Sequence, residues 1–293
     1  MLPLYYCLYA RHAKAELIAA LAECDAAIRL DSTSAAAYLH RGLVWHQAGH
    51  PGRAIVDYTA AIGLAPRSAI GYCQRACAWR DRGDLARAVG DFGEALRLDP
   101  RHADAYFERG KLLNRMGDRK RALADFNAAL ELEPGLLAAL RPIGVDWFGQ
   151  GEFALAAELM RIGEGPADAH AVLYRFLARA RGGAEAGAEL AANAAKVANK
   201  AWPYPLIELF LDERSPHNAL AIAGLRPHER LEAHFHIGQW YLLHGNRKAA
   251  KANLRLVAAR YPHHLPECKI ARSELRRLRG ARTAAATSGL PPS

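Results

Sequence analysis

One 34-residue stretch decides the fold: ADAYFERGKLLNRMGDRKRALADFNAALELEPGL, Ala103 to Leu136. Aromatic, small and helix-ending residues follow one another along it in a fixed order. They are Tyr106, Gly110, Leu113, Gly117, Ala122, Phe126, Ala129 and Pro134, at positions 4, 8, 11, 15, 20, 24, 27 and 32. Small side chains at positions 8 and 20 let two antiparallel helices approach closely, since larger ones would overpack their crossing. Glycine at position 15 ends the first helix and proline at 32 stops the second. The stretch therefore predicts a helical hairpin.

The same order of residue sizes recurs every 34 residues on both sides of this hairpin. One period earlier the positions hold Tyr72, Ala76, Trp79, Gly83, Ala88, Phe92, Ala95 and Pro100. Two periods earlier they hold Tyr38, Gly42, Trp45, Gly49, Ala54, Tyr58, Ala61 and Pro66. One period later they hold Leu140, Gly144, Trp147, Gly151, Ala156, Met160 and Gly163, and then the pattern decays. A repeated hairpin with an apolar face must bury that face against its neighbours, so the period predicts a stack.

In these residues the sequence resembles the tetratricopeptide repeat (TPR) family, whose period is about 34 residues. The resemblance implies an all-α fold, a right-handed TPR-type α-α superhelix of antiparallel helix pairs. It also implies that the first helix of each pair lines a concave groove with positions 2, 5, 6, 9, 12 and 13 of the repeat. The predicted groove residues are Leu39, His40, Leu43, Gln47, Cys73, Gln74, Cys77, Asp81, Phe107, Glu108, Lys111, Arg115 and Arg141.

The predicted groove is apolar at one end and charged toward the other, which favours an extended or helical peptide over a small metabolite. Chaperone-binding relatives hold a C-terminal carboxylate with Lys, Arg and Asn side chains at five groove positions. This chain has Leu39, Leu43, Gln74, Asp104 and Glu108 there. Because two of these five residues are acidic, we expect no carboxylate-clamp binding of chaperones.

The repeat frame also predicts how the chain is divided. Residues 1–34 keep the frame of a second helix but lack a well-formed first one, and the spacing from Leu137 to Leu231 is not a multiple of 34. The predicted segments are a degenerate repeat at 1–34, four repeats at 35–68, 69–102, 103–136 and 137–166, an out-of-phase helical segment at 167–230, a C-terminal repeat with a capping helix at 231–282, and a disordered tail at 283–293.

Three stretches of the second half resemble the C-terminal half of the new lipoprotein I family. They are HAVLYRFLARAR (His170 to Arg181), AWPYPLIELFLDERS (Ala201 to Ser215) and HFHIGQWYLLHGNRKAAKANLRLVAARYPHH (His234 to His264). Members of that family are bacterial outer-membrane TPR lipoproteins that act as homodimeric adaptors for peptidoglycan hydrolases and a protease. The resemblance therefore implies an envelope adaptor and a homodimer. It does not extend to the lipid anchor, because Cys7 follows two tyrosines where the anchored cysteine follows small residues.

Composition and charge limit the other classes of function. No run approaches the roughly 18 apolar residues that span a membrane. The five cysteines show no framework spacing, and residues 1–11 do not have the pattern of a secretory signal. We therefore expect a cytoplasmic protein from this sequence, or a periplasmic or outer-membrane-associated one if a signal peptide precedes it. The whole net charge of +9 is carried by residues 241–282.

The last predicted helix carries a basic stripe at helical spacing. Its members are Lys269, Arg272, Arg276 and Arg279, while Ile270, Leu275 and Leu278 are predicted to face inward. The stripe is interpreted first as the solvated face of a capping helix, which repeat arrays need for solubility. Its alternative is a site for nucleic acid, anionic lipid or an acidic partner, with attraction that weakens as salt rises. The helix lacks the aromatic residues that stack single-stranded bases.

Nothing in the sequence favours catalysis, a metal or a cofactor. Cys73 and Cys77 lie one helical turn apart, so their Cβ atoms would be about 5–6 Å apart, beyond the roughly 3.5–4.5 Å that a disulfide needs. We interpret them as small apolar fillers. The late histidines have no metal-binding spacing, and His234 and His236 lie on different faces of a helix. The sequence predicts a non-enzymatic TPR scaffold or adaptor for protein partners, with the envelope adaptor and the anion-binding module as alternatives.

Overall fold

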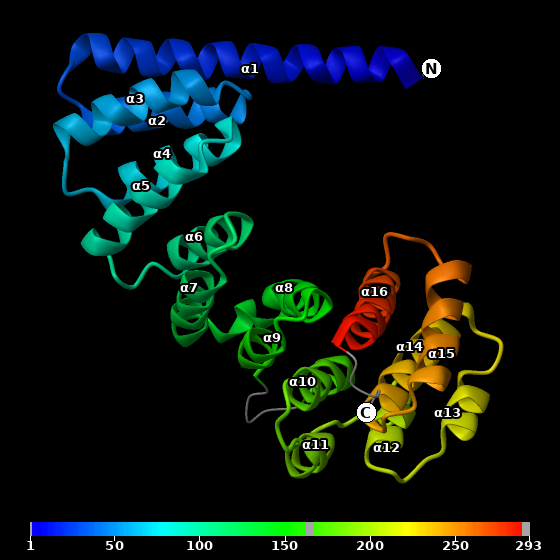
Figure 1. The fold of residues 1–293 in the computed structure, drawn as a ribbon. Helices are drawn as coiled ribbons and strands as arrows, with labels where there is room; N and C mark the ends of the chain where they lie inside the picture. Colours follow the sequence, from blue (N-terminus) through cyan, green and yellow to red (C-terminus); the bar gives the residue numbers. More distant parts are fainter. Residues whose placement is uncertain (1, 162–166, 289–293) are drawn as a thin grey trace. The chain divides into compact units, whose positions relative to one another are not determined.

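The computed structural model describes residues 2–161 and 167–288, and these are helical with a single short 3-10 turn and no strand (Figure 1). The all-α expectation is therefore confirmed. The helices form two compact units, unit 1 at Met1–Leu136 and unit 2 at Leu137–Ser293. The fourth predicted repeat thus begins unit 2 rather than ending the array of the first three. Among the described residues no helix is long and apolar enough to cross a membrane.

Unit 1 is a row of helices in which each helix packs on the next along the chain. Its helices are α1 (Leu2–Leu30), α2 (Ala35–Gln47), α3 (Pro51–Leu64), α4 (Ala69–Arg82), α5 (Leu85–Leu98), α6 (Ala103–Arg115) and α7 (Arg119–Leu132), followed by the turn η1 (Pro134–Leu136). The pairs α2–α3, α4–α5 and α6–α7 are the three predicted hairpins.

Glycine at position 8 sets the close crossing of the first and third of these pairs, and Ala76 holds that position in the second. A Cβ atom on Gly110 would lie 2.6 Å from Cε1 of Phe126, a ring that is fully buried. In the first hairpin, a Cβ atom on Gly42 would lie at the same distance from Cε1 of Tyr58. At the turn, Gly117 has a φ of 85°, which ends α6 and lets Asp118 cap α7 by accepting a hydrogen bond from the Arg121 amide. The predicted roles of positions 8 and 15 therefore each have a contact or a backbone angle that explains them.

The N-terminal segment differs from its prediction. Residues 1–34 were predicted as a degenerate repeat, but Leu2–Leu30 is one continuous helix. The physical reason lies at position 15 of the frame. The three hairpins have glycine with positive φ there, whereas this segment has Ala15, a strong helix former that offers no stop.

A buried ion pair that the sequence analysis did not single out joins the two helices of each hairpin in unit 1. Asp57, Asp91 and Asp125, all buried, each accept two hydrogen bonds of 2.6–2.9 Å from one arginine. The arginines are Arg41, Arg75 and Arg109, each also lying over the ring of the tyrosine three residues before it. Such bidentate pairs are stronger than neutral hydrogen bonds and specify geometry. The signal was present in the sequence as arginine at position 7 and aspartate at position 23.

In the described residues, unit 2 combines two hairpins with four helices of another phase and one final helix. Its helices are α8 (Leu137–Gln150), α9 (Phe153–Leu159), α10 (Ala169–Arg181), α11 (Gly187–Ala194), α12 (Tyr204–Phe210), α13 (Pro216–Ala223), α14 (Pro227–Leu243), α15 (Arg247–Arg260) and α16 (Pro266–Ser288). The pairs α8–α9 and α14–α15 are the fourth and the C-terminal predicted repeats. The predicted end of the fourth repeat falls partly on residues 162–166, which lie outside the described residues.

Two features make unit 2 a closed body instead of an open row. Every residue of α14 from Leu231 to Gln239 is buried, and α14 packs against α10, α12, α13, α15 and α16. The last helix, α16, returns to pack on the first, α8 (Figure 1). It also continues to Ser288 through the alanines at 284–286, so residues 283–288 are helical where a disordered tail was predicted. Residues 289–293 of that predicted tail lie outside the described part.

Candidate functional site

The predicted groove residues before Arg141 lie on α2, α4 and α6, the first helices of the three hairpins, and we call this side the first-helix face of unit 1. Four of them contribute to the packing within and between the hairpins. Cys73 is buried, Cys77 packs against the same core cluster, and Leu39 and Leu43 pack against the cluster around Ala54 and Tyr58. Burial raises the pKa of the Cys73 thiol to about 12, so this thiol stays protonated and unreactive near neutral pH.

Most charges on the first-helix face are paired with one another. Nε2 of His46 lies 2.7 Å from the Asp81 carboxylate, which also accepts a hydrogen bond from Arg80. Arg80 donates to Glu108 at 2.8 Å, and Lys111 donates to the other oxygen of Glu108 at 2.7 Å. The bond from Arg80 holds the pKa of Asp81 below its usual range. This chain of ion pairs connects α2, α4 and α6 and fixes the charged part of the face.

The remaining predicted residues are available to another molecule. Phe107 is half-buried, with its ring 6.2 Å from that of Phe126 and the Lys111 ammonium 5.1 Å from its centre. Arg115 is exposed and has no partner among the described residues. The other available residues are His40 and Gln47, which are exposed, and Gln74, which is half-buried.

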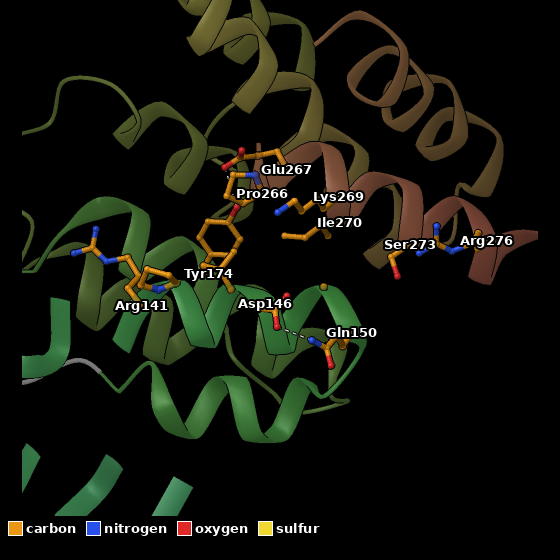
Figure 2. Close-up of a pocket in the computed structure, with 13 residues that line it drawn as sticks. Arg141, Asp146, Gln150, Tyr174, Pro266, Glu267, Lys269, Ile270, Ser273 and Arg276 are labelled. Carbon is orange, nitrogen blue, oxygen red and sulfur yellow. Dashed lines mark hydrogen bonds between the residues drawn. The ribbon is translucent and has the colours of Figure 1, made fainter. Parts of the chain in front are cut away.

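Arg141 belongs to unit 2, where it lines a pocket of about 500 Å³ between α8, α10 and α16. We call this pocket the trough. Its lining residues are Arg141, Pro142, Val145, Asp146, Gly149, Gln150, Tyr174, Pro266, Glu267, Lys269, Ile270, Ser273 and Arg276. Figure 2 shows Tyr174 near the middle, with Arg141 and Arg276 toward opposite ends. Two sets of residues that the sequence analysis assigned to separate sites, the groove and the basic stripe, therefore meet here.

A buried charge network holds α16 against the rest of unit 2. Glu274, whose side chain is 1% exposed, accepts two hydrogen bonds of 2.9 and 3.0 Å from Arg181 of α10. It also accepts one from Arg277, which in turn donates to the Gly149 carbonyl of α8 at 2.7 Å. Arg181 completes the network by donating to Gln239 of α14. Both long walls of the trough are therefore fixed to the core.

The polar groups of the trough include acceptors as well as cations. The Tyr174 hydroxyl donates to Glu267 at 3.1 Å, and burial raises the pKa of this hydroxyl so that it stays a donor. Asp146 accepts a hydrogen bond of 2.5 Å from Gln150. Lys269 and Arg276 are exposed and have no partner among the described residues.

The predicted basic stripe is divided in the structure. Lys269 and Arg276 line the trough, and Arg279 is exposed outside it. Arg272 instead donates to the Ala258 carbonyl near the end of α15 and contacts His263. Ile270 and Leu278 are buried, as predicted for the inward face. The four basic residues therefore do not present one continuous surface.

Two buried groups in unit 2 were not anticipated. Glu232 accepts from Nε2 of His170 at 3.0 Å and from the Trp202 indole at 2.5 Å. Although burial acts to raise the pKa of Glu232, these bonds lower it overall. His236 is fully buried among the rings of Tyr174, Phe210 and Phe235, and burial lowers its pKa to about 3. His234 is buried and bonds Asn253. Among the described residues no group of three His, Cys, Asp or Glu side chains is placed to hold a metal.

Comparison with known proteins points to the same repeat. The tetratricopeptide repeat family matches at residues 103–135 in unit 1 and at 232–264 in unit 2. No curated protein sequence matches the chain. The match in the second half is to the repeat itself, and the likeness to the new lipoprotein I family stays a prediction.

Solved structures with similar folds include several TPR proteins. The crystal structure of MamA is 22% identical, with 51% of this chain and 88% of that chain covered and a TM-score of 0.47. YrrB, described as a TPR protein with an unusual peptide-binding site, is 17% identical, with 83% and 95% covered and a TM-score of 0.42. The second TPR domain of human RPAP3, in complex with an HSP70 peptide, is 32% identical, with 32% and 79% covered and a TM-score of 0.32.

Because all three scores lie below 0.5, the identification depends on the two family matches and on the helix pairing described above. The chain therefore carries tetratricopeptide repeats in both of its units, on an all-α fold of antiparallel helix pairs.

Proposed function

We propose that this chain is a non-enzymatic scaffold that binds a segment of another protein on the first-helix face of unit 1. The observation that carries the proposal is the exposure of Phe107 and Arg115, and their lack of strong internal bonds among the described residues, within the repeat that the family matches. Phe107 offers a half-buried aromatic surface beside Lys111, and Arg115 offers an exposed guanidinium group with no partner among the residues that the structure describes. Aromatic and arginine side chains are enriched at the cores of protein interfaces and among their energetic hot spots.

The paired charges on the same face restrict the partner. His46, Asp81, Arg80 and Glu108 are committed to one another, so they shape the surface without offering free charge. We propose a partner segment with an apolar residue for Phe107 and a carboxylate for Arg115. The exposed Asp104 repels a C-terminal carboxylate at a position where clamp-type repeats attract it, and Glu108 is already bonded to Arg80 and Lys111, so the proposal excludes chaperone tails. A homodimeric adaptor in the cell envelope remains a finer proposal from the sequence resemblance alone.

Quantitative co-purification with the full chain tests this face. The variant Phe107→Ala with Arg115→Glu should reduce recovery of specific partners at least tenfold, since it removes an aromatic contact and reverses a charge. A control with Val56→Ala and Arg97→Glu changes exposed residues of the second helices α3 and α5, and should keep the partners. Circular dichroism confirms that both variants fold. Equal recovery with both variants would exclude the first-helix face as the binding surface.

A further inference from the structure

We propose that the trough in unit 2 is a second binding site, which takes a short acidic peptide with an apolar side chain between its carboxylates. This site is separate from the first-helix face of unit 1. One of its walls, α16, lies outside the repeat pattern. The proposal assigns a role to the residues of the basic stripe that face the trough.

The size and shape of the trough fit a few residues of peptide. A volume of about 500 Å³ lies within the roughly 300–1,000 Å³ range of ligand-binding pockets. The floor is apolar, because it is made by Pro142, Val145 and Gly149 of α8 and Ile270 of α16. A Cβ atom on Gly149 would lie 3.0 Å from Ile270, so the helices meet closely at this point. An apolar side chain of the peptide would lie on this floor.

The charges of the trough select acidic partners. Lys269 and Arg276 have no partner among the described residues, and they are spaced by two helical turns along one side of α16. Arg141 approaches Asp168 at 3.6 Å, and that pair is partly exposed. Three cations on two opposed helices are thus placed to meet carboxylates along an extended ligand (Figure 2). Their attraction should weaken with salt, because exposed charges are screened over about 10 Å at 0.1 M.

The two carboxylates in the trough favour a peptide over a simple anion or a nucleic acid. Asp146 and Glu267 each accept one hydrogen bond from within the protein and keep further acceptor capacity. The backbone amides of a peptide would donate to them. A phosphate backbone has no such donors and would be repelled by both groups. The mixture of cations and acceptors therefore matches a chain with carboxylate side chains and N–H groups.

The trough is formed before any ligand arrives. Glu274, Arg181 and Arg277 fix α16 through buried ionic hydrogen bonds, and Tyr174 ties the start of α16 to α10 through Glu267. A preformed site saves the entropy that a mobile one would lose on binding. The variants chosen below therefore spare this network.

The test measures fluorescence anisotropy of the full chain with a labelled, end-blocked six-residue peptide that alternates glutamate and leucine. Binding at 50 mM salt that weakens at 500 mM supports the proposal. Replacing the glutamates by lysine, or the leucines by serine, should each raise the Kd about tenfold or more. A double-stranded DNA of similar charge should bind more weakly than the peptide. Absence of peptide binding at 50 mM salt, or tighter binding of the DNA, would overturn the proposal.

Two matched charge reversals on α16 separate the trough from diffuse attraction. Arg276 lines the trough, so the variant Arg276→Glu should raise the peptide Kd about tenfold. Arg279→Glu changes the same charge on an exposed residue outside the trough and should alter the Kd less than twofold. Equal effects of the two variants would show that the basic helix attracts acids without a site. Because Phe107 is unchanged in both, the co-purification assay for unit 1 should give its normal result, so the two proposals can fail separately.

Discussion

The two units use the same helical hairpin but are stabilised in different ways. In unit 1 each helix packs mainly on its neighbours in sequence, and one arginine–aspartate pair recurs in every hairpin. In unit 2 the fourth repeat has Ile143 and Leu159 at the positions of that pair, and its first helix is covered by α16. Periodic contacts therefore build an open row, while contacts between distant parts of the sequence close unit 2. The difference shows that the same hairpin can stand in an open row or form a wall of a closed core.

Breaking the Glu274 network should give the largest effect on stability. Glu274→Ala removes a carboxylate that is 1% exposed and leaves two partly buried guanidinium groups, of Arg181 and Arg277, without it, which costs about 3–5 kcal/mol. Asp91→Ala removes the corresponding partner of Arg75 in unit 1, where the two side chains are 12% and 19% exposed. We expect a smaller loss of about 1–3 kcal/mol there.

Hydrogen exchange of the backbone amides, measured in the full chain across a urea titration, reports the stability of each unit separately. Glu274→Ala should increase exchange in α10, α14 and α16 and leave α4 and α5 protected. Glu185→Ala, at an exposed position of unit 2, is the control and should change little. Uniform loss of protection across both units would show that they unfold together, contrary to the comparison.

Acid should destabilise unit 2 through His236. Its pKa is about 3 in the folded state against about 6.5 in the unfolded chain, so the unfolded state binds the proton more tightly. Stability is therefore lost as pH falls below 6.5, by about 2 kcal/mol at pH 5. His170, whose pKa is raised mainly by its bond to Glu232, acts in the opposite direction, because its protonated form is favoured in the folded state. Among the described histidines of unit 1 none is buried.

The variant His236→Phe isolates this contribution. The phenyl ring can occupy the aromatic surroundings of Tyr174, Phe210 and Phe235, and it removes Nδ1, a buried atom with no hydrogen-bond partner. We expect the variant to lose about 2 kcal/mol less than the wild type between pH 7 and pH 5, measured by urea unfolding in each buffer. An unchanged pH dependence would assign the acid sensitivity to other groups.

The repeated parts of the fold could be predicted from the sequence, because the pattern of small and large side chains reflects contacts within one hairpin. Gly110 against Phe126 and the turn at Gly117 are contacts of that kind. The closure of α16 on α8 was missed because it depends on contacts more than a hundred residues apart, such as Arg277 to Gly149, which leave no period. The trough could not be predicted for the same reason. Its residues were noticed, but Arg141 was assigned to a groove and Arg276 to a stripe.

The smallest effects are expected from alanine substitutions of the glycines at which two helices cross. They compare how tightly the helices are packed there in each unit. Gly110→Ala in unit 1 places a Cβ atom 2.6 Å from the rigid Phe126 ring, and the overpacking should exceed the helix-propensity gain, for a net loss of about 1–2 kcal/mol. Gly144→Ala in unit 2 meets Cγ of Met160 at 2.6 Å, an atom near the start of a buried side chain, so Met160 must change rotamer; because this side chain is unbranched, we expect a loss of about 1 kcal/mol, below that of Gly110→Ala. Gly90→Ala in α5 meets nothing within 4 Å and should stabilise by up to about 1 kcal/mol. Thermal unfolding of the three variants gives the comparison directly. A greater loss of stability for Gly144→Ala than for Gly110→Ala would mean that the closed core of unit 2 prevents Met160 from moving. Closure of the unit, rather than stiffness of the side chain, would then determine how tightly each hairpin is packed.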